Sequence, residues 1–246
     1  MGEPLVLLPG LSCDAAVWRP VIDGLPGVTC RVAALADTDD LGWMAQSVLD
    51  AAPARFALAG HSMGGRVALE IVRRAPARVS RLALLDTGFT ARPDGEQGEA
   101  ERSHRHALLA LAREQGMAAM GRRWSEPMVH RSRLADAPLM EAIVDMIARS
   151  TPDRFARQIE ALLARPDASD VLAALRCPTL VLCGRDDGWA SVAQHEEIAA
   201  RVAGSRLAVV EDCGHMAPME QPREVAAALQ AWLSEQVASV PVPLAG

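Results

Sequence analysis

Short apolar runs alternate along most of the chain with longer stretches whose apolar residues recur every three or four positions. Runs of the first kind predict buried strands, and the second spacing predicts helices that pack on them. The expected strands lie at 5–8, 30–33, 56–60, 82–85, 179–182 and 207–210. The expected helices lie at about 14–25, 40–51, 64–74 and 191–203, with a last one starting near Pro222. This alternation predicts an α/β fold, in which helices cover both faces of a mostly parallel sheet.

One internal segment, residues 93–172, breaks this pattern. It opens with Pro93-Asp94-Gly95, has no strand-like run, and carries helical spacing at 99–115, 117–124, 138–150 and 154–164. An all-helical insertion after one strand of a parallel sheet predicts a lid over the edge where the chemistry lies. The alternative is a set of ordinary packing helices. The predicted organisation is a core of 1–92 and 173–246 with a lid of 93–172, and with a frayed tail at 240–243.

Composition and charge narrow the function classes. With 246 residues, half of them apolar, the chain can form one sizeable core. A net charge of −6 without a basic cluster argues against nucleic acid or an anionic membrane as the main partner. The first apolar run is too short for a signal sequence, and no stretch approaches a membrane span. Five cysteines without paired metal spacing favour reduced thiols in the cytoplasm and no metal site.

The most specific chemical signal is a serine between a strand and a helix. Ser62 lies at the centre of Gly60-His61-Ser62-Met63-Gly64, directly after the apolar run 56–60. The glycines two before and two after it allow a sharp turn, because side chains there would collide with the neighbouring elements. Such a turn holds the hydroxyl away from the sheet, where a base and a substrate can both reach it. We therefore predict that Ser62 is a nucleophile.

A nucleophilic serine needs a base, because its hydroxyl hardly ionises near neutral pH. His215 follows the last strand and so lies at the same edge of the sheet, which makes it the expected base. The other five histidines are expected to be solvated or structural. They are His61 beside the serine, His104, His106 and His130 in the polar insertion, and His195 on a helix surface.

The base needs a carboxylate to orient it, and three aspartates compete for that role. Asp187 is preferred, because it lies three residues past Gly184, where the strand 179–184 ends, and this spacing suits the site better than that of Asp186. Asp186 is expected to be a turn residue. Asp86 ends the preceding strand and reaches the same edge, so it stays open as the alternative.

Negative charge on the reacting oxygen needs hydrogen-bond donors. Met63 follows the serine at a helix N-terminus and can offer its backbone N–H. The second expected donor is the N–H of Leu11, in the loop after the first strand, where Gly10 lets the backbone turn toward the site. Cys13 lies in the same loop but has no dedicated base, so it is not expected to react.

Four segments together resemble the α/β-hydrolase superfamily. They are the Pro9-Gly10 loop, Gly60–Gly65, Gly184–Asp187 and Gly214–Pro222, and the chain order Ser, Asp, His is the order of that superfamily. The resemblance covers nearly all of the chain outside the insertion and is closest to small bacterial carboxylesterases, including the pimeloyl-ester carboxylesterase group. Two departures stand out: proline replaces the usual histidine before Gly10, and the usual N-terminal β-hairpin is missing, which implies about six strands.

The resemblance implies a serine carboxylesterase with the triad Ser62, Asp187 and His215, oxyanion donors at Leu11 and Met63, no cofactor, and a small-molecule ester as substrate. Thioester hydrolysis, carbon–carbon bond hydrolysis, a cofactor-free haloperoxidase-like activity and a receptor that signals through its lid stay open as alternatives. Trp124 and Trp189 are the expected pocket residues, and Arg122 and Arg123 are the arginines that could bind an acid. The sequence predicts no oligomeric state.

Overall fold

The computed structural model describes residues 3–235 and contains a six-stranded sheet in the order β2-β1-β3-β4-β5-β6. Every neighbouring pair of strands is parallel. The strands are β1 Leu5–Leu8, β2 Cys30–Val32, β3 Phe56–His61, β4 Val79–Leu85, β5 Thr179–Gly184 and β6 Arg206–Val210. The predicted α/β class and the number of strands are confirmed. The predicted fraying of 240–243 lies outside the described residues.

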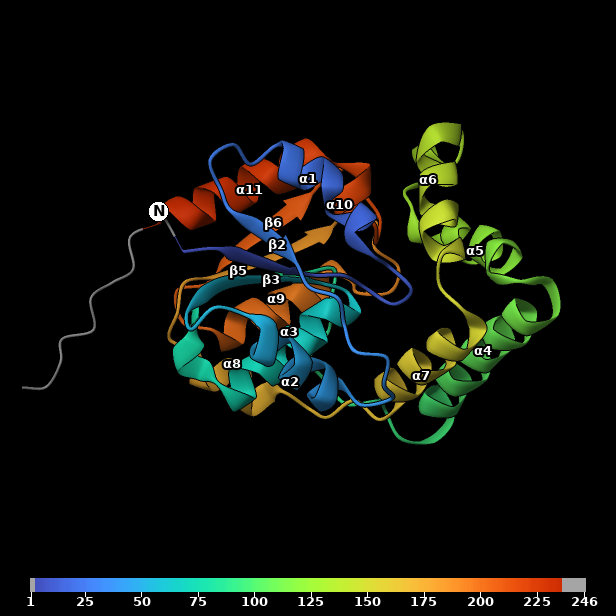
Figure 1. Ribbon diagram of the computed structural model, residues 1–246, viewed down its shortest axis with the longest axis horizontal. Coiled ribbons are helices and arrows are strands. Elements are labelled where there is room, and N and C mark those ends of the chain that lie inside the picture. The colour runs from blue at the N-terminus through green and yellow to red at the C-terminus, as the bar shows by residue number, and fades with distance from the viewer. Residues whose placement is uncertain (1–2, 236–246) are drawn as a thin grey trace, which may run out of the picture.

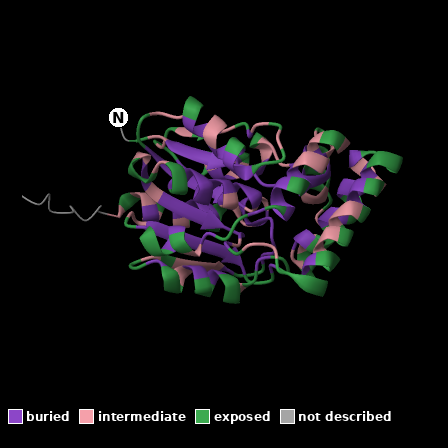
Figure 2. Ribbon diagram, turned by 90° about the horizontal axis from the view of Figure 1, so that it is seen from below, coloured by how far each residue is buried: buried purple, intermediate pink, exposed green. Residues whose placement is uncertain are grey.

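Helices cover both faces of this sheet, which explains why its inner strands are buried and mostly apolar. Every residue of β1, β3 and β5 is buried, and Figure 2 shows the sheet as the most deeply buried part of the molecule. In Figure 1, α1 and α11 lie on one face, while α2, α3 and α8 lie on the other. The covering helices are α1 Arg19–Asp23, α2 Leu41–Ala51, α3 Met63–Arg74, α8 Ser169–Ala174, α9 Val192–Arg201, α10 Ala217–Glu220 and α11 Pro222–Ser234.

The first predicted helix, 14–25, is not continuous. A 3₁₀ turn spans Ala15–Val17, and α1 begins anew at Arg19. Pro20 explains the break, because it has no N–H to continue a helix and is tolerated only in a first turn. The short helix α8 was not predicted, since its six residues are too few to show a clear periodicity.

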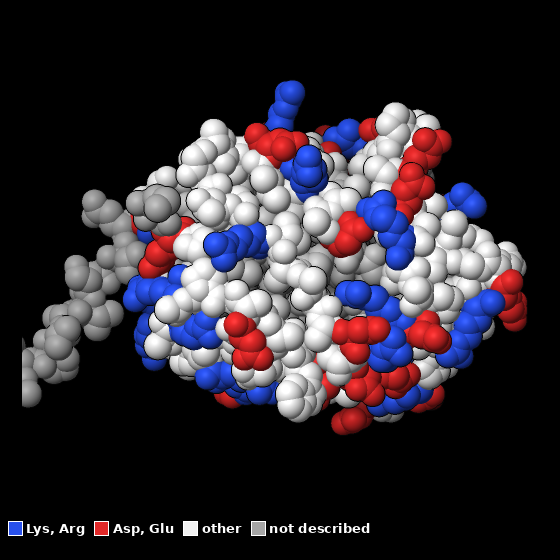
Figure 3. Space-filling view, viewed as in Figure 1, with Lys and Arg blue, Asp and Glu red and all other residues white. Residues whose placement is uncertain are grey.

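Four of the five α-helices between β4 and β5 form the insertion, while the fifth, α8, packs against the helices of the core. The four are α4 Gly95–Gln115, α5 Met117–Ser125, α6 Ala137–Ala148 and α7 Pro152–Leu163. Figure 1 shows them gathered beyond the carboxyl ends of the strands, outside the two helix layers of the sheet. On the face shown in Figure 3, acidic and basic side chains are mixed over α4 and α7. Within residues 3–235, no helix is both long and apolar enough to span a membrane.

Parallel pairing brings four loops together at one edge of the sheet. β3 and β4 end in register, with His61 opposite Leu85, and β5 and β6 end with Gly184 opposite Val210. The residues that follow these strands therefore meet at the carboxyl edge, which faces the inserted helices. The candidate site lies there.

Candidate active site

Ser62 occupies a backbone conformation that side chains rarely adopt. Its φ is 54° and its ψ is −118°, between the end of β3 and the start of α3. A methyl group at Gly60 would lie 2.3 Å from the carbonyl oxygen of Gly64, and one at Gly64 would lie 2.4 Å from that of Leu8. The two glycines thus allow strand, turn and helix to approach closely, and a positive φ of this kind costs about 1–3 kcal/mol.

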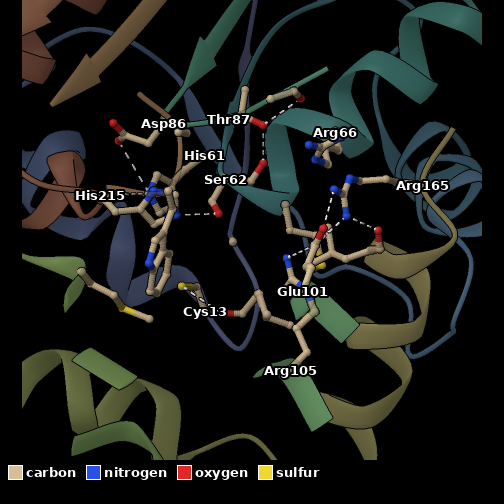
Figure 4. Close-up of a pocket in the computed structure, with 18 of the residues that line it drawn as sticks. Cys13, His61, Ser62, Arg66, Asp86, Thr87, Glu101, Arg105, Arg165 and His215 are labelled. Carbon is tan, nitrogen blue, oxygen red and sulfur yellow. Dashed lines mark hydrogen bonds and ion pairs between the residues drawn. The ribbon is translucent and has the colours of Figure 1, made fainter. Parts of the chain in front are cut away.

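The serine hydroxyl begins a chain of two hydrogen bonds. Ser62 Oγ lies 2.8 Å from His215 Nε2, and His215 Nδ1 lies 2.8 Å from Asp187 Oδ2. Figure 4 shows the Ser62 and His215 side chains pointing toward each other. The structure thus brings together the three residues that the sequence predicts as nucleophile, base and orienting acid.

Asp187 is fixed from its other side by the backbone. Its Oδ1 accepts hydrogen bonds from the N–H groups of Trp189 at 2.8 Å and Ala190 at 2.9 Å. Burial by itself raises the pKa of this carboxyl. The charge and hydrogen bond of His215, together with the two N–H groups, lower it by more than burial raises it. The pKa of Asp187 therefore lies below its ordinary value. Asp187 is therefore an ionised acceptor for His215 Nδ1–H.

The two alternative aspartates do not contact His215. Asp86 is fully buried; its Oδ1 accepts from the N–H of Gly184 at 3.0 Å, and its Oδ2 lies 3.7 Å from His61 Nε2. Burial, followed by the charge of Asp187, raises the pKa of Asp86 well above its ordinary value. Asp186 is half exposed and lies 3.8 Å from His130 Nε2.

The loop that carries His215 is held by a buried carboxylate that the sequence analysis missed. Glu220 accepts hydrogen bonds from the backbone N–H groups of Gly214, Met216 and His130, at 3.1, 3.1 and 2.7 Å. Its burial raises the pKa of Glu220 above the ordinary value. A glutamate five residues after the base histidine, in the quoted run Gly214–Pro222, is the signal that could have indicated this role.

His61 also holds the loop that carries His215. Its Nε2 donates to the carbonyl oxygen of His215 at 2.8 Å, since a carbonyl can only accept. Burial, together with the nearby His215, lowers the pKa of His61 to about 3, so its ring is neutral near pH 7. His61 is a buried structural histidine, in agreement with the prediction.

The prediction that His195 lies on a helix surface is wrong. Its side chain is fully buried, where Nε2 accepts from the N–H of Thr87 at 3.1 Å and Nδ1 donates to the carbonyl of Ser191 at 3.0 Å. The helical spacing predicts α9 but does not indicate its buried face, because α9 packs against the sheet and places His195 beside the loop after β4.

Two residues beside Ser62 carry backbone N–H groups that bond to no other group among the described residues. They are Leu11 and Met63, and both line the cavity that Ser62 also lines. Met63 begins α3, so its N–H is one of those that a helix leaves without an internal partner. These are the two expected oxyanion donors, and their free N–H groups are what that role requires.

The cavity has a volume of about 620 Å³, and both predicted tryptophans line it. The rings of Trp124 and Trp189 stack with centroids 5.8 Å apart, and Trp189 lies 4.9 Å from the His215 ring. Cys13 also lines the cavity, but burial, together with Asp14, raises the pKa of its thiol to about 12. That thiol is protonated near pH 7 and is a poor nucleophile.

The arginines that line the cavity are not the ones that the sequence predicts. Arg122 and Arg123 are exposed and do not line the cavity, whereas Arg66, Arg105 and Arg165 do. The three come from α3, α4 and the turn after α7, so no run of basic residues marks them in the sequence. The sequence has no run of basic residues, and the three arginines come together only in the folded protein.

Known proteins were compared with the chain. The sequence model described as "Alpha/beta hydrolase family" matches residues 5–228. The chain is 27% identical over 254 residues to the pimeloyl-[acyl-carrier protein] methyl ester esterase of Aromatoleum aromaticum, covering 94% of this chain and 98% of that protein. It is 28% identical over 256 residues to the (E)-2-((N-methylformamido)methylene)succinate hydrolase of Acinetobacter baylyi, covering 94% and 90%. A malate-bound thermophilic esterase from Thermogutta terrifontis superposes with a TM-score of 0.81 at 28% identity, covering 95% and 90%.

Proposed function

The chain belongs to the alpha/beta hydrolase family, and from this premise we propose that it is a serine carboxylesterase acting through an acyl-enzyme intermediate. The hydrogen-bonded chain from Ser62 through His215 to Asp187, open to the cavity, is the observation that carries the proposal. Two relatives with esterase names, one known by sequence and one by structure, support it.

In the first half of the reaction, Ser62 Oγ attacks the ester carbonyl carbon while His215 Nε2 takes the hydroxyl proton. The charge that develops on the carbonyl oxygen is received by the N–H groups of Leu11 and Met63, with the N-terminal end of α3 behind Met63. Asp187 holds the Nδ1–H tautomer and stabilises the positive ring. When the carbon–oxygen ester bond breaks, His215 returns its proton to the leaving alcohol, and the acyl group stays on Ser62.

In the second half, water replaces the alcohol. His215 Nε2 takes a proton from the water, whose oxygen attacks the acyl carbon, and the same two N–H groups receive the oxyanion. The bond to Ser62 Oγ then breaks, the proton returns to Oγ, and the carboxylic acid leaves. The protein ends the cycle as it began, so these steps need no further reactant besides water.

We further propose that the insertion 93–172 is a lid that shapes the substrate pocket. Trp124 of α5, Phe155 of α7 and Leu108 of α4 supply apolar wall to the same cavity that Ser62 lines from the core. Substrate selection would therefore depend on the insertion, whereas bond cleavage would depend on the core.

The test is steady-state hydrolysis of p-nitrophenyl acetate and butyrate by the protein and its Ser62→Ala variant. We expect turnover by the first and a fall in kcat of about a millionfold in the second, since the triad acts as a unit. The same attack serves thioesters and activated carbon–carbon bonds, so matched thioesters belong in the panel. Ester turnover retained by Ser62→Ala would refute the proposal.

A further inference from the structure

Three arginine side chains line one side of the cavity. Arg66 lies one turn into α3 from Ser62, Arg105 lies on α4, and Arg165 follows α7. In Figure 4 their guanidinium groups gather on the side of Ser62 that is opposite to His215. Four residues along a helix correspond to about 6 Å, so the cluster lies within reach of a small substrate attached to Ser62.

One carboxylate faces these three positive groups. Glu101 accepts from Arg105 Nε at 2.9 Å and from both terminal nitrogens of Arg165, at 2.7 and 2.8 Å. Burial raises its pKa, but these arginines outweigh the burial and lower the pKa of Glu101 to about 2, so the group is ionised. Three guanidinium groups and one carboxylate thus leave the cluster with a net charge of +2.

Arg66 is the unpaired member of the cluster. Its Nη1 donates to the carbonyl oxygen of Thr90 at 2.9 Å, and among residues 3–235 no carboxylate lies at ion-pair distance from it. Burial, followed by the charge of Arg165, lowers the pKa of Arg66 to about 9, so the side chain still carries its charge near pH 7. Arg165 Nε is buried and, within the described part of the chain, has no hydrogen-bond partner.

Several surface arginines pair with carboxylates, whereas others, such as Arg78, bond to backbone carbonyls. Arg149 donates to Asp14 at 2.7 Å, and Arg157 contacts Asp37 at 2.5 Å, both at the surface. Positive charge that is removed from water without a partner costs free energy. Arg66 is half-buried and lines the cavity beside the reactive serine without a carboxylate partner, which favours an anion on this side when substrate binds.

The position of His215 decides which part of the substrate carries the anion. His215 protonates the leaving alcohol, so the alcohol lies toward His215, and the acyl chain extends to the opposite side, where the arginines lie. Resting on the proposed esterase function, we propose that the acyl part ends in a carboxylate bound by Arg66, in the positive field of Arg105 and Arg165. The substrates are then monoesters of short dicarboxylic acids, and the released product is a dicarboxylic acid.

Arginine suits this role because its planar fork matches a carboxylate with two parallel hydrogen bonds. Leu108 and Leu162 line the cavity near Arg105 and Arg165 in the chain, and they give an acyl chain an apolar path to the charged end. A neutral ester of the same length would leave the guanidinium groups without their anion.

The experiment measures kcat/KM for monomethyl glutarate and monomethyl adipate against the neutral methyl pentanoate and methyl hexanoate. We expect the protein to prefer each monoester over its neutral match. In Arg66→Gln this preference should fall by about 30- to 100-fold, the effect of losing a hydrogen bond between charged groups. Arg66→Lys should keep part of the preference, and Arg122→Gln, which removes an exposed charge outside the cavity, should keep all of it.

Two results would overturn the inference while leaving the esterase proposal intact. One is equal hydrolysis of charged and neutral esters, and the other is a preference that Arg66→Gln does not change. If the protein hydrolyses no ester at all, calorimetry tests the anion site instead. It measures the binding of monomethyl glutarate and of methyl pentanoate to the Ser62→Ala protein. Tighter binding of the charged ester, lost in the double variant with Arg66→Gln, supports the anion site, and equal or absent binding refutes it.

Discussion

Asn in place of Asp187 would change one atom in the site while keeping its shape. In the protein, Oδ2 accepts from His215 Nδ1 at 2.8 Å, and Oδ1 accepts from the N–H groups of Trp189 and Ala190. Those two N–H groups hold the remaining amide oxygen of the asparagine. Its NH₂ group must then face Nδ1 and act as a donor, which drives the His215 proton to Nε2. In that tautomer Nε2 cannot take the proton of Ser62.

The expected loss in kcat is about 10⁴-fold, which corresponds to about 5 kcal/mol of transition-state stabilisation. Asp86→Asn is the matched control, because Asp86 is another buried aspartate at this edge and does not contact His215. Its Oδ1 would keep the hydrogen bond from Gly184 N–H, and its raised pKa means that the neutral amide resembles the protonated acid. We expect this change to cost about 1 kcal/mol, or about fivefold in kcat.

The assay is steady-state hydrolysis of p-nitrophenyl butyrate by both variants, with thermal unfolding measured to show that each is folded. Asp187→Asn should keep its KM within the range of the unchanged protein, since the aspartate orients the base and does not contact the substrate. If Asp86→Asn proves the more damaging change, Asp86 orients the base during turnover and the reasoning from hydrogen-bond geometry is refuted.

Three further predictions concern the pocket, the loop and pH. Trp124→Ala should change the relative kcat/KM for acetate, butyrate and octanoate esters several-fold, since each buried methylene contributes about 0.8 kcal/mol; identical ratios would contradict the role of the insertion. Glu220→Ala removes the acceptor of three backbone N–H groups and should lower the free energy of unfolding by about 2–4 kcal/mol in urea titrations, whereas an unchanged midpoint would argue against it. The pKa of His61 is about 3 in the folded protein against an ordinary 6.5, so the unfolded chain binds the extra proton first as pH falls. Stability should therefore decline by about 3 kcal/mol between pH 6.5 and pH 4, and His61→Gln should flatten that decline; equal slopes would contradict it.

The parts of the fold that follow local rules were predictable from the sequence. Ser62 stands between glycines whose freedom from side chains the turn requires, so the strand, the turn and the helix could all be placed. Asp187 and His215 follow strands of one parallel sheet, and parallel strands bring their ends to one edge whatever lies between them.

Features that depend on tertiary packing were not predictable. The cavity arginines, Arg66, Arg105 and Arg165, are separated by 39 and 60 residues, and none is distinguished locally from an exposed arginine. The burial of His195 depends on which face of α9 meets the sheet, and a polar residue on a helix gives no sign of that. Both became visible only when the elements were packed together.

The most direct test of the central claim is covalent labelling of the nucleophile. A fluorophosphonate should add one adduct to the protein, and peptide mapping by mass spectrometry should place it on Ser62. The Ser62→Ala variant should remain unlabelled, and Asp187→Asn should be labelled slowly, since its histidine is a poor base. An adduct on any other residue, or equal labelling of Ser62→Ala, would contradict the account.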